Sequence, residues 1–148
     1  MAEILHRVGV RSGVADVYRA LTTQQGLAGW WTADTRGGFD VGGIIEFRFG
    51  TRGYFDMKVV ALDPGRRVVW QVVRGPEDWV GTQLSFDLTQ NGEEATVLFK
   101  HAGWQEQSEF MHHCSTKWAT FLLSMKKLVE TGAGSPFPDD LHITVNWD

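Results

Sequence analysis

A single apolar stripe runs through residues 110–128. Its members follow one another at intervals of four, four, three, four and three positions: Phe110, Cys114, Trp118, Phe121, Met125 and Leu128. Apolar residues at this spacing share one face of an α-helix, and that face has to be buried against another layer of the protein. Gly132 marks the end of the helix, because glycine is a natural residue after a helical C-terminus. The sequence therefore predicts one long amphipathic helix that needs a large partner layer.

The partner layer is predicted from the long middle of the chain, where apolar and polar residues alternate. Alternation of this kind indicates antiparallel strands that have one buried and one solvated face. The runs assigned to strands are 45–49, 55–59, the β-branched run 67–74, 84–88 and 97–101. Proline, glycine and asparagine at 63–65, 75–76 and 91–92 favour turn conformations and separate neighbouring strands.

The start of the chain predicts a strand and two short helices. Residues 4–10 alternate like a strand, and Ser12 is predicted to cap the helix that follows, because its hydroxyl can accept from an unpaired backbone N–H. Thr22 or Thr23 is predicted to cap a second helix that ends at residues 30–31. The chain of 148 residues fits a single domain. The expected fold is α+β, with a curved antiparallel sheet wrapped around the long C-terminal helix and two short helices after the first strand.

The composition argues against several kinds of partner. The net charge is −4, and the sequence has no cluster of lysine and arginine of the kind that binds the phosphates of nucleic acid. Cys114 is the only cysteine, so no intramolecular disulfide or thiolate zinc framework can form. A zinc site built from His101, His113 and Asp56 has no spacing signature, and we expect no metal and no cofactor. Because the chain has neither a signal-peptide core nor a membrane-spanning run, we expect a cytoplasmic protein.

Several local runs resemble the SRPBCC superfamily, whose members are START-like and similar to birch-pollen allergens. The runs are 14–21, 29–31, 60–69, 101–104 and 118–128, and together they span nearly the whole chain up to Pro138. Within the superfamily the chain is most similar to bacterial relatives of the C-terminal domain of the heat-shock-protein ATPase activator. The resemblance implies a helix-grip fold with an apolar cavity between the long helix and the sheet.

The resemblance leaves three functions open. The superfamily includes lipid carriers, hormone receptors and cyclases, and no catalytic signature is common to all. The leading expectation is the binding of a small, mostly apolar ligand, and the second is a cyclase-like or hydrolase-like enzyme that uses the same cavity. The third is a protein-interaction module associated with a chaperone in the stress response. The activator's chaperone role also depends on an additional N-terminal domain, for which this chain is expected to have no room.

The predicted ligand site consists of inward-facing residues, most of them aromatic. We expect a cavity of roughly 300–1,000 Å³, the usual range for small-molecule sites. His101, Tyr54 and Asp56 are the polar groups expected to orient the ligand, and His101 or Asp56 would be the acid–base group of an enzyme. The alternative interpretation is that the aromatic residues simply fill the core. The predicted site residues are Trp30, Trp31, Phe47, Met57, Trp70, Phe86, Phe99, His101, Trp118, Phe121 and Leu122.

The segment 139–148 has a pattern of its own. Leu141, Ile143, Val145 and Trp147 alternate with polar residues, which is the period of a half-buried strand. We predict that this tail is ordered and extended. It would pack either as an extra strand on the edge of its own sheet or on a second copy of the chain, which would make a symmetric dimer.

Overall fold

The fold consists of one strongly curved, open sheet that wraps around a long helix. The computed structural model describes residues 2–145 of the chain. Along the sequence the elements are β1 (Ala2–Arg11), α1 (Val14–Thr22), α2 (Gln24–Trp30), β2 (Asp34–Gly37), β3 (Ile44–Arg48), β4 (Tyr54–Asp63), β5 (Arg67–Arg74), β6 (Gln83–Asn91), β7 (Glu94–Trp104) and α3 (Glu109–Thr131). Apart from β2, which was not predicted, this order is the one expected from the sequence.

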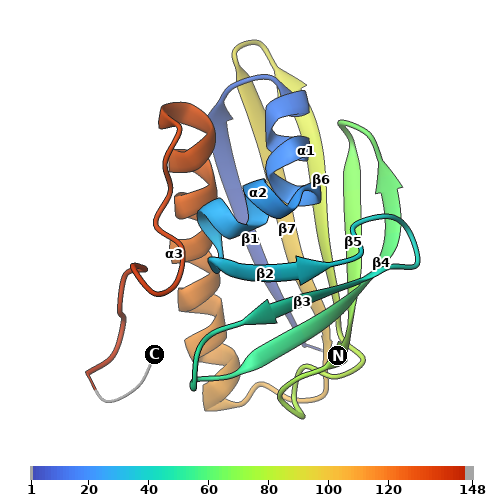
Figure 1. Ribbon diagram of the computed structural model, residues 1–148, viewed down its shortest axis with the longest axis vertical. Helices are drawn as coiled ribbons and strands as arrows, with labels where there is room; N and C mark the ends of the chain where they lie inside the picture. Colours follow the sequence, from blue (N-terminus) through green and yellow to red (C-terminus); the bar gives the residue numbers. More distant parts are fainter. Residues whose placement is uncertain (1, 146–148) are drawn as a thin grey trace.

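The strands form one antiparallel sheet in the order β1-β7-β6-β5-β4-β3-β2. Figure 1 shows β6 and β7 running nearly vertically, whereas β2 and β3 cross the view at a steep angle to them. The register between β4 and β5 shifts at two places, and such bulges increase the local bend of a sheet. The strong curvature brings both ends of the sheet around α3, and the predicted helix-grip fold is confirmed.

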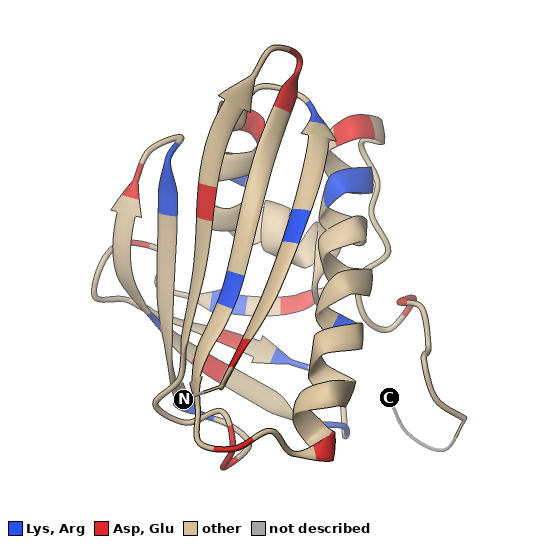
Figure 2. Cartoon of the chain, turned by 180° about the vertical axis from the view of Figure 1, so that it is seen from behind, with Lys and Arg blue, Asp and Glu red and all other residues tan. Residues whose placement is uncertain are grey.

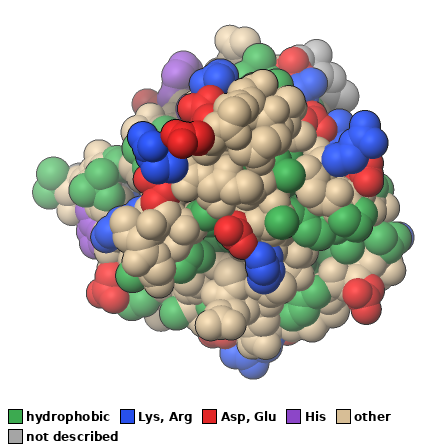
Figure 3. Space-filling model, turned by 90° about the horizontal axis from the view of Figure 1, so that it is seen from above, with side chains coloured by type: hydrophobic (Ala, Val, Ile, Leu, Met, Phe, Trp, Pro, Cys, Tyr) green, Lys and Arg blue, Asp and Glu red, His purple; other side chains and the backbone are tan. Residues whose placement is uncertain are grey.

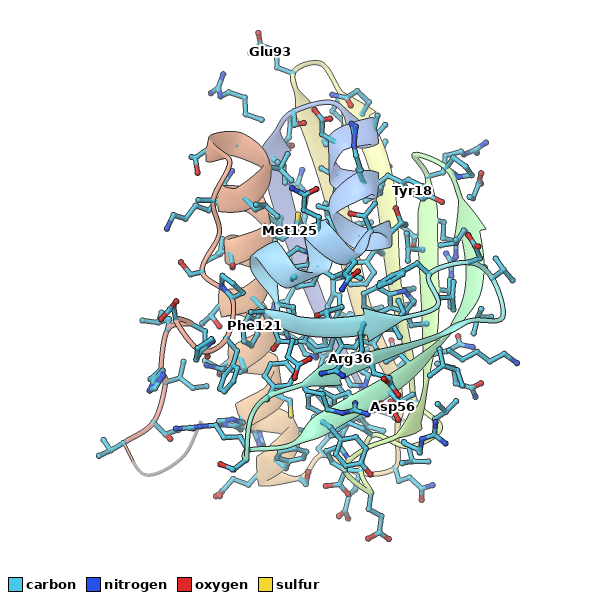
Figure 4. All side chains as sticks on the ribbon, viewed as in Figure 1. Tyr18, Arg36, Asp56, Glu93, Phe121 and Met125 are labelled. Atoms are coloured by element: carbon cyan, nitrogen blue, oxygen red, sulfur yellow. The ribbon has the colours of Figure 1, made fainter. Side chains whose placement is uncertain are left out.

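Helix α3 has a capping residue at each end, and the predicted end at Gly132 is confirmed. The hydroxyl of Ser108 accepts from the Met111 N–H at the start. Gly132 follows the last turn with φ of 92°, and its N–H donates to the Leu128 carbonyl. In Figure 4, Phe121 and Met125 lie along α3 on the side of the core. The predicted stripe is buried along its middle, and its first and last members, Phe110 and Leu128, are half-buried.

Of the two caps predicted for the short helices, one is wrong and the other is confirmed. Gly13 rather than Ser12 is the N-cap of α1, and no side chain caps that helix, so the predicted Ser12 cap is wrong. The Ser12 hydroxyl donates instead to the Gly13 carbonyl and the Asp16 carboxylate. The predicted Thr23 cap of α2 is confirmed, because its hydroxyl accepts from Gly26 N at 3.0 Å.

Close packing between α1 and α2 requires a glycine at position 26. A Cβ there would lie 2.6 Å from Ala20 Cα, closer than real Cβ contacts allow. The same junction is locked by Trp30, whose indole N–H donates to the Ala20 carbonyl at 2.8 Å. The Trp30 carbonyl in turn accepts from the Ser124 hydroxyl on α3 at 2.9 Å. Trp30 therefore joins all three helices.

The C-terminal segment returns to the domain after α3. Phe137 and Thr32 form an isolated bridge, in which Phe137 N donates to the Trp31 carbonyl at 2.8 Å. Residues 139–145 belong to no strand, so the predicted extra edge strand is wrong for this part of the tail. Leu141 and Val145 are exposed there. Trp147 lies outside the described residues, and packing of the tail on a second copy stays a prediction.

Charged residues are spread over the surface. Figure 2 shows both signs interspersed on the outer face of the sheet, and no single-sign stripe follows a strand there. At the end that carries the β6–β7 hairpin, Figure 3 shows charged and hydrophobic side chains side by side. Within residues 2–145, no helix has the length and hydropathy that a membrane crossing requires.

Candidate functional site

A cavity of about 380 Å³ lies at the end of the molecule where α3 begins. Its walls come from α3, from the loops that follow β3 and β5, and from the C-terminal segment. The two loops lie near the bottom of Figure 1, and the C-terminal segment passes beside α3. Because most of the wall is apolar, the cavity suits a small and mainly apolar molecule. The lining residues are Trp31, Phe49, Arg52, Gly53, Phe55, Pro76, Trp79, Phe110, His113, Cys114, Lys117, Trp118, Phe121, Phe137 and Asp140.

The apolar wall is a set of aromatic rings in contact. The ring of Trp31 lies 4.9 Å from that of Trp118 and stacks on Phe55 at 5.8 Å. Phe55 in turn stacks on Trp79 at 4.0 Å. Aromatic pairs at these separations attract one another beyond the effect of burial alone. A flat apolar ligand would therefore meet ring faces and edges on several sides.

Trp79 reaches this wall from the turn between β5 and β6. The turn is held by backbone hydrogen bonds from Trp79 N to the Pro76 carbonyl and from Thr82 N to the Trp79 carbonyl, each 2.9 Å long. The Thr82 hydroxyl also donates to the Trp79 carbonyl. The turn thus fixes the backbone of Trp79, and the side chain is only 3% exposed.

An ion pair crosses the wall between α3 and the C-terminal segment. Lys117 Nζ donates to Asp140 Oδ2 at 2.5 Å and to the Leu141 carbonyl at 2.7 Å. Both side chains are well buried, with 13% of Lys117 and 3% of Asp140 exposed. Lys117 Nζ also lies 5.1 Å from the ring centre of Phe121. These contacts hold the segment around Asp140 in place as part of the cavity wall.

His101 lies behind the wall in a hydrogen-bonded chain. The Trp118 indole N–H donates to His101 Nδ1 at 3.2 Å, and His101 Nε2 lies 2.8 Å from the Thr82 hydroxyl. Because an indole N–H can only donate, Nδ1 accepts and the ring proton sits on Nε2, which donates to Thr82. Burial lowers the pKa of His101 to about 3. His101 is therefore neutral near pH 7 and positions two elements of the wall, α3 and the β5–β6 turn.

The structure places the predicted site residues in two groups. Trp31, Trp118 and Phe121 line the cavity. The others are buried in the packed part of the core, beyond the cavity, and they are Trp30, Phe47, Met57, Trp70, Phe86, Phe99, His101 and Leu122. The core is thus largely filled, and the remaining space lies at one end rather than along the whole helix.

Two predicted polar groups point away from the cavity, and the expectation that they orient a ligand there is wrong. Tyr54 is 43% exposed at the start of β4. Asp56 is buried between Arg48 and Arg74, with ion-pair distances of 2.6 and 2.8 Å. Burial alone would raise the pKa of Asp56, but the hydrogen bonds from Arg74 and Arg48 outweigh it and lower that pKa. Asp56 is labelled in Figure 4. Its role is structural, because strand alternation turns it to the face opposite Phe55 and Met57.

Cys114 and the three residues considered for a zinc site do not form a reactive or metal-binding group. Burial raises the pKa of the Cys114 thiol to about 12, so Cys114 remains protonated and serves as an apolar wall residue. His101, His113 and Asp56 lie in the core, on the cavity wall and on the outer face, respectively. Among the described residues no group of three or more potential metal-binding side chains converges.

Several wall residues could not be predicted from the sequence, because they lie on turns or on the tail. Trp79, Phe137 and Asp140 belong to no periodic run, so no pattern predicts the direction of their side chains. Phe49 and Phe55 do follow the strand alternation and could have been included from it. His113 and Lys117 border the apolar stripe of α3, and that position was the available signal for them.

A strongly curved antiparallel sheet wrapped around one long helix, with an aromatic cavity at one end, defines a helix-grip protein. The family described as Activator of Hsp90 ATPase homolog 1-like protein matches residues 12–130, and this chain belongs to that family. No curated protein matches the chain.

Three solved structures are similar to this chain in fold. The solution structure of the Aha1 dimer from Colwellia psychrerythraea is 45% identical, covers 90% of this chain and all (100%) of that chain, and has a TM-score of 0.83. DynU16, described as a putative protein in the dynemicin biosynthetic locus, is 21% identical over 89% of this chain and 48% of its own, with a TM-score of 0.73. CalU16 from Micromonospora echinospora is 19% identical over 90% of this chain and 76% of its own, with a TM-score of 0.72. The last two similarities show the shared fold.

Proposed function

We propose that this protein binds a small, mostly apolar ligand in the aromatic cavity beside α3. The observation that carries the proposal is the cavity itself, because about 380 Å³ lies within the range of small-molecule sites and the wall is mainly rings. A chain that only needed a stable core would gain by filling this space, since apolar contacts across a void are lost. Catalysis is not part of the proposal, because neither His101 nor Asp56 lines the cavity.

Binding is tested with methylnaphthalene as a probe, followed by tryptophan fluorescence. Trp31, Trp79 and Trp118 line the cavity, so a bound ring should change their emission in a saturable way. The probe should also raise the melting temperature, because a ligand that binds only the folded state stabilises it by mass action.

A variant that narrows the cavity gives the decisive comparison. Cys114→Leu adds volume at the wall and should weaken probe binding about tenfold, equivalent to about 1.4 kcal/mol. Leu123→Met is the matched control, because Leu123 is 57% exposed on the same helix. Equal affinity in all three proteins, or no saturable fluorescence change, would refute binding in this cavity.

A second candidate function is contact with a chaperone. The family and the 45% identical relative, which is described as an Aha1 dimer, favour it. Leu5 and Leu98 are 61% and 49% exposed on the paired strands β1 and β7. They are diagonal neighbours, because Leu5 pairs with Lys100 and Arg7 pairs with Leu98, so both lie on the outer face.

The chaperone contact is tested by adding the protein to an Hsp90-type ATPase. We expect a higher ATPase rate with the native protein and no stimulation with Leu5→Asp/Leu98→Asp, because charges in an apolar interface oppose its burial. A fold check by melting temperature accompanies the variant. An ATPase rate that does not respond to the native protein would remove this candidate.

We also propose that the protein forms a homodimer in which the tail contributes to the interface. The support is the dimeric state named for the relative and the exposure of Leu141 and Val145, at 67% and 100%. Removing residues 143–148 keeps the Leu141 carbonyl that bonds to Lys117. We expect the mass in solution to fall from dimer to monomer, while circular dichroism shows that the shortened chain stays folded. A native protein that is already monomeric at high concentration would contradict the dimer.

A further inference from the structure

The C-terminal segment is joined firmly to the cavity wall at Phe137. The backbone N–H of Phe137 donates to the Trp31 carbonyl at 2.8 Å, and its carbonyl accepts from Ala33 N at 3.1 Å. The Phe137 ring lies 5.4 Å from the ring of Phe49, which directly follows β3. Backbone and ring contacts therefore fix this part of the segment to the wall.

The next residues, 139–141, are attached to α3 in a different way. Lys117 donates to the carboxylate of Asp140 at 2.5 Å and to the Leu141 carbonyl at 2.7 Å. Residues 139–141 belong to no helix or strand, and the side chain of Leu141 is 67% exposed. Segments that lack regular structure and buried apolar contacts open locally at a low cost in free energy. We therefore expect the contacts with Lys117 to determine how often residues 139–141 leave the wall.

We propose that residues 139–141 form a strap that closes the cavity on the side of α3, and that the ion pair of Lys117 and Asp140 is the latch of this strap. Both members of the pair line the cavity, so their separation would remove part of its wall. The pair is well buried, and charges attract more strongly when little water surrounds them. When the strap opens, water solvates both charges and their attraction falls. Phe137 remains the fixed end of the strap.

The strap concerns access to the cavity, and it does not depend on which molecule is bound there. Cys114 can report on this access, because it lines the cavity, is 5% exposed and is the only cysteine of the chain. We expect the small uncharged reagent methyl methanethiosulfonate to modify the thiol when the strap has opened. The rate of modification is followed by mass spectrometry. Global unfolding also exposes the thiol, so the unfolding rate of each protein is measured beside it.

Two single variants and their combination test the latch. Lys117→Met and Asp140→Asn each remove one charge of the pair, and we expect each to raise the modification rate about tenfold. The double variant should be no faster than the faster single variant, because both residues act through the same contact. Lys100→Gln is the control, since it removes an ion pair with Glu3 that lies on the outer face of the sheet. The modification rate of the control should equal that of the native protein.

Three results would overturn the inference. Equal modification rates in the native protein and both single variants would show that the ion pair does not control access to Cys114. Effects of the single variants that multiply in the double variant would show that the two residues act separately. A faster modification that is fully explained by faster global unfolding would show that the pair stabilises the whole domain and does not hold a strap.

Methylnaphthalene separates the strap from the proposed function. A latch predicts that its entry and exit rates rise by the same factor in Asp140→Asn, so that the dissociation constant changes by less than about twofold. A rise of the exit rate alone would mean that Asp140 only contacts the bound molecule, and this result would contradict the strap. If methylnaphthalene does not bind to the native protein while the Cys114 rates are as expected, the proposed function fails and the strap is supported.

Discussion

Trp118→Ala should lower the free energy of unfolding by about 3–5 kcal/mol, as truncations of large buried aromatic residues do. Trp118 is 2% exposed and its ring lies 4.6 Å from Phe99 and 4.9 Å from Trp31. The truncation would join the cavity to a new void and leave His101 Nδ1 without its donor. The loss is measured by urea denaturation, and a value below about 1 kcal/mol would show that α3 is not held as described.

Two companion variants divide this effect into packing and hydrogen bonding. Trp118→Phe keeps an aromatic ring but removes the indole N–H, so it should cost only about 1–3 kcal/mol, the penalty for one unsatisfied buried acceptor. Leu123→Ala on the exposed side of α3 should change stability by less than about 0.5 kcal/mol. Equal losses at Trp118 and Leu123 would contradict the assignment of the buried face.

Stability should fall in acid because of His101. Its pKa is about 3 in the folded protein, against an ordinary value of 6.5, since burial disfavours the charged ring. Between these two values the unfolded chain binds a proton that the folded protein does not. The contribution of neutral His101 is therefore fully present above pH 6.5 and is lost progressively as the pH falls toward 3. The expected slope from this group is about 1.4 kcal/mol per pH unit in that window.

The measurement compares unfolding free energies of the native protein and His101→Phe between pH 7 and pH 4. The phenylalanine variant loses two hydrogen bonds and should be less stable at neutral pH. It cannot gain a proton at this position, so its stability should decline less steeply with acid. The difference between the two curves isolates His101 from the other histidines and the carboxylates. Parallel curves would show that position 101 takes up its proton equally in both states and is not buried as described.

His101 shows which properties of an inward-facing side chain the alternation of a strand does not predict. Alternation correctly turns Phe99 and His101 inward and Lys100 outward, and all three lie so in the structure. Alternation does not say whether an inward histidine meets a cavity or other side chains. The surroundings of His101 depend on Trp118 in α3 and on Thr82 in the turn before β6. Both residues are distant from His101 in the sequence and contact it only in the folded, curved sheet.

Local patterns were sufficient to predict every helix and every strand except β2, in the correct order. The stripe of α3, the alternation of β3 to β7 and the Thr23 cap follow from local spacing and local hydrogen bonding, which neighbouring residues control. Together with the family resemblance they were sufficient for the helix-grip fold. The location of the empty space follows from the packing of the folded chain and from no local pattern. The position of the cavity depends on how closely facing side chains fill the curve of the sheet, and on Trp79, Phe137 and Asp140, which come from a turn and the tail. Such segments carry no periodicity, so their side chains acquire a direction only through the contacts that the folded chain provides.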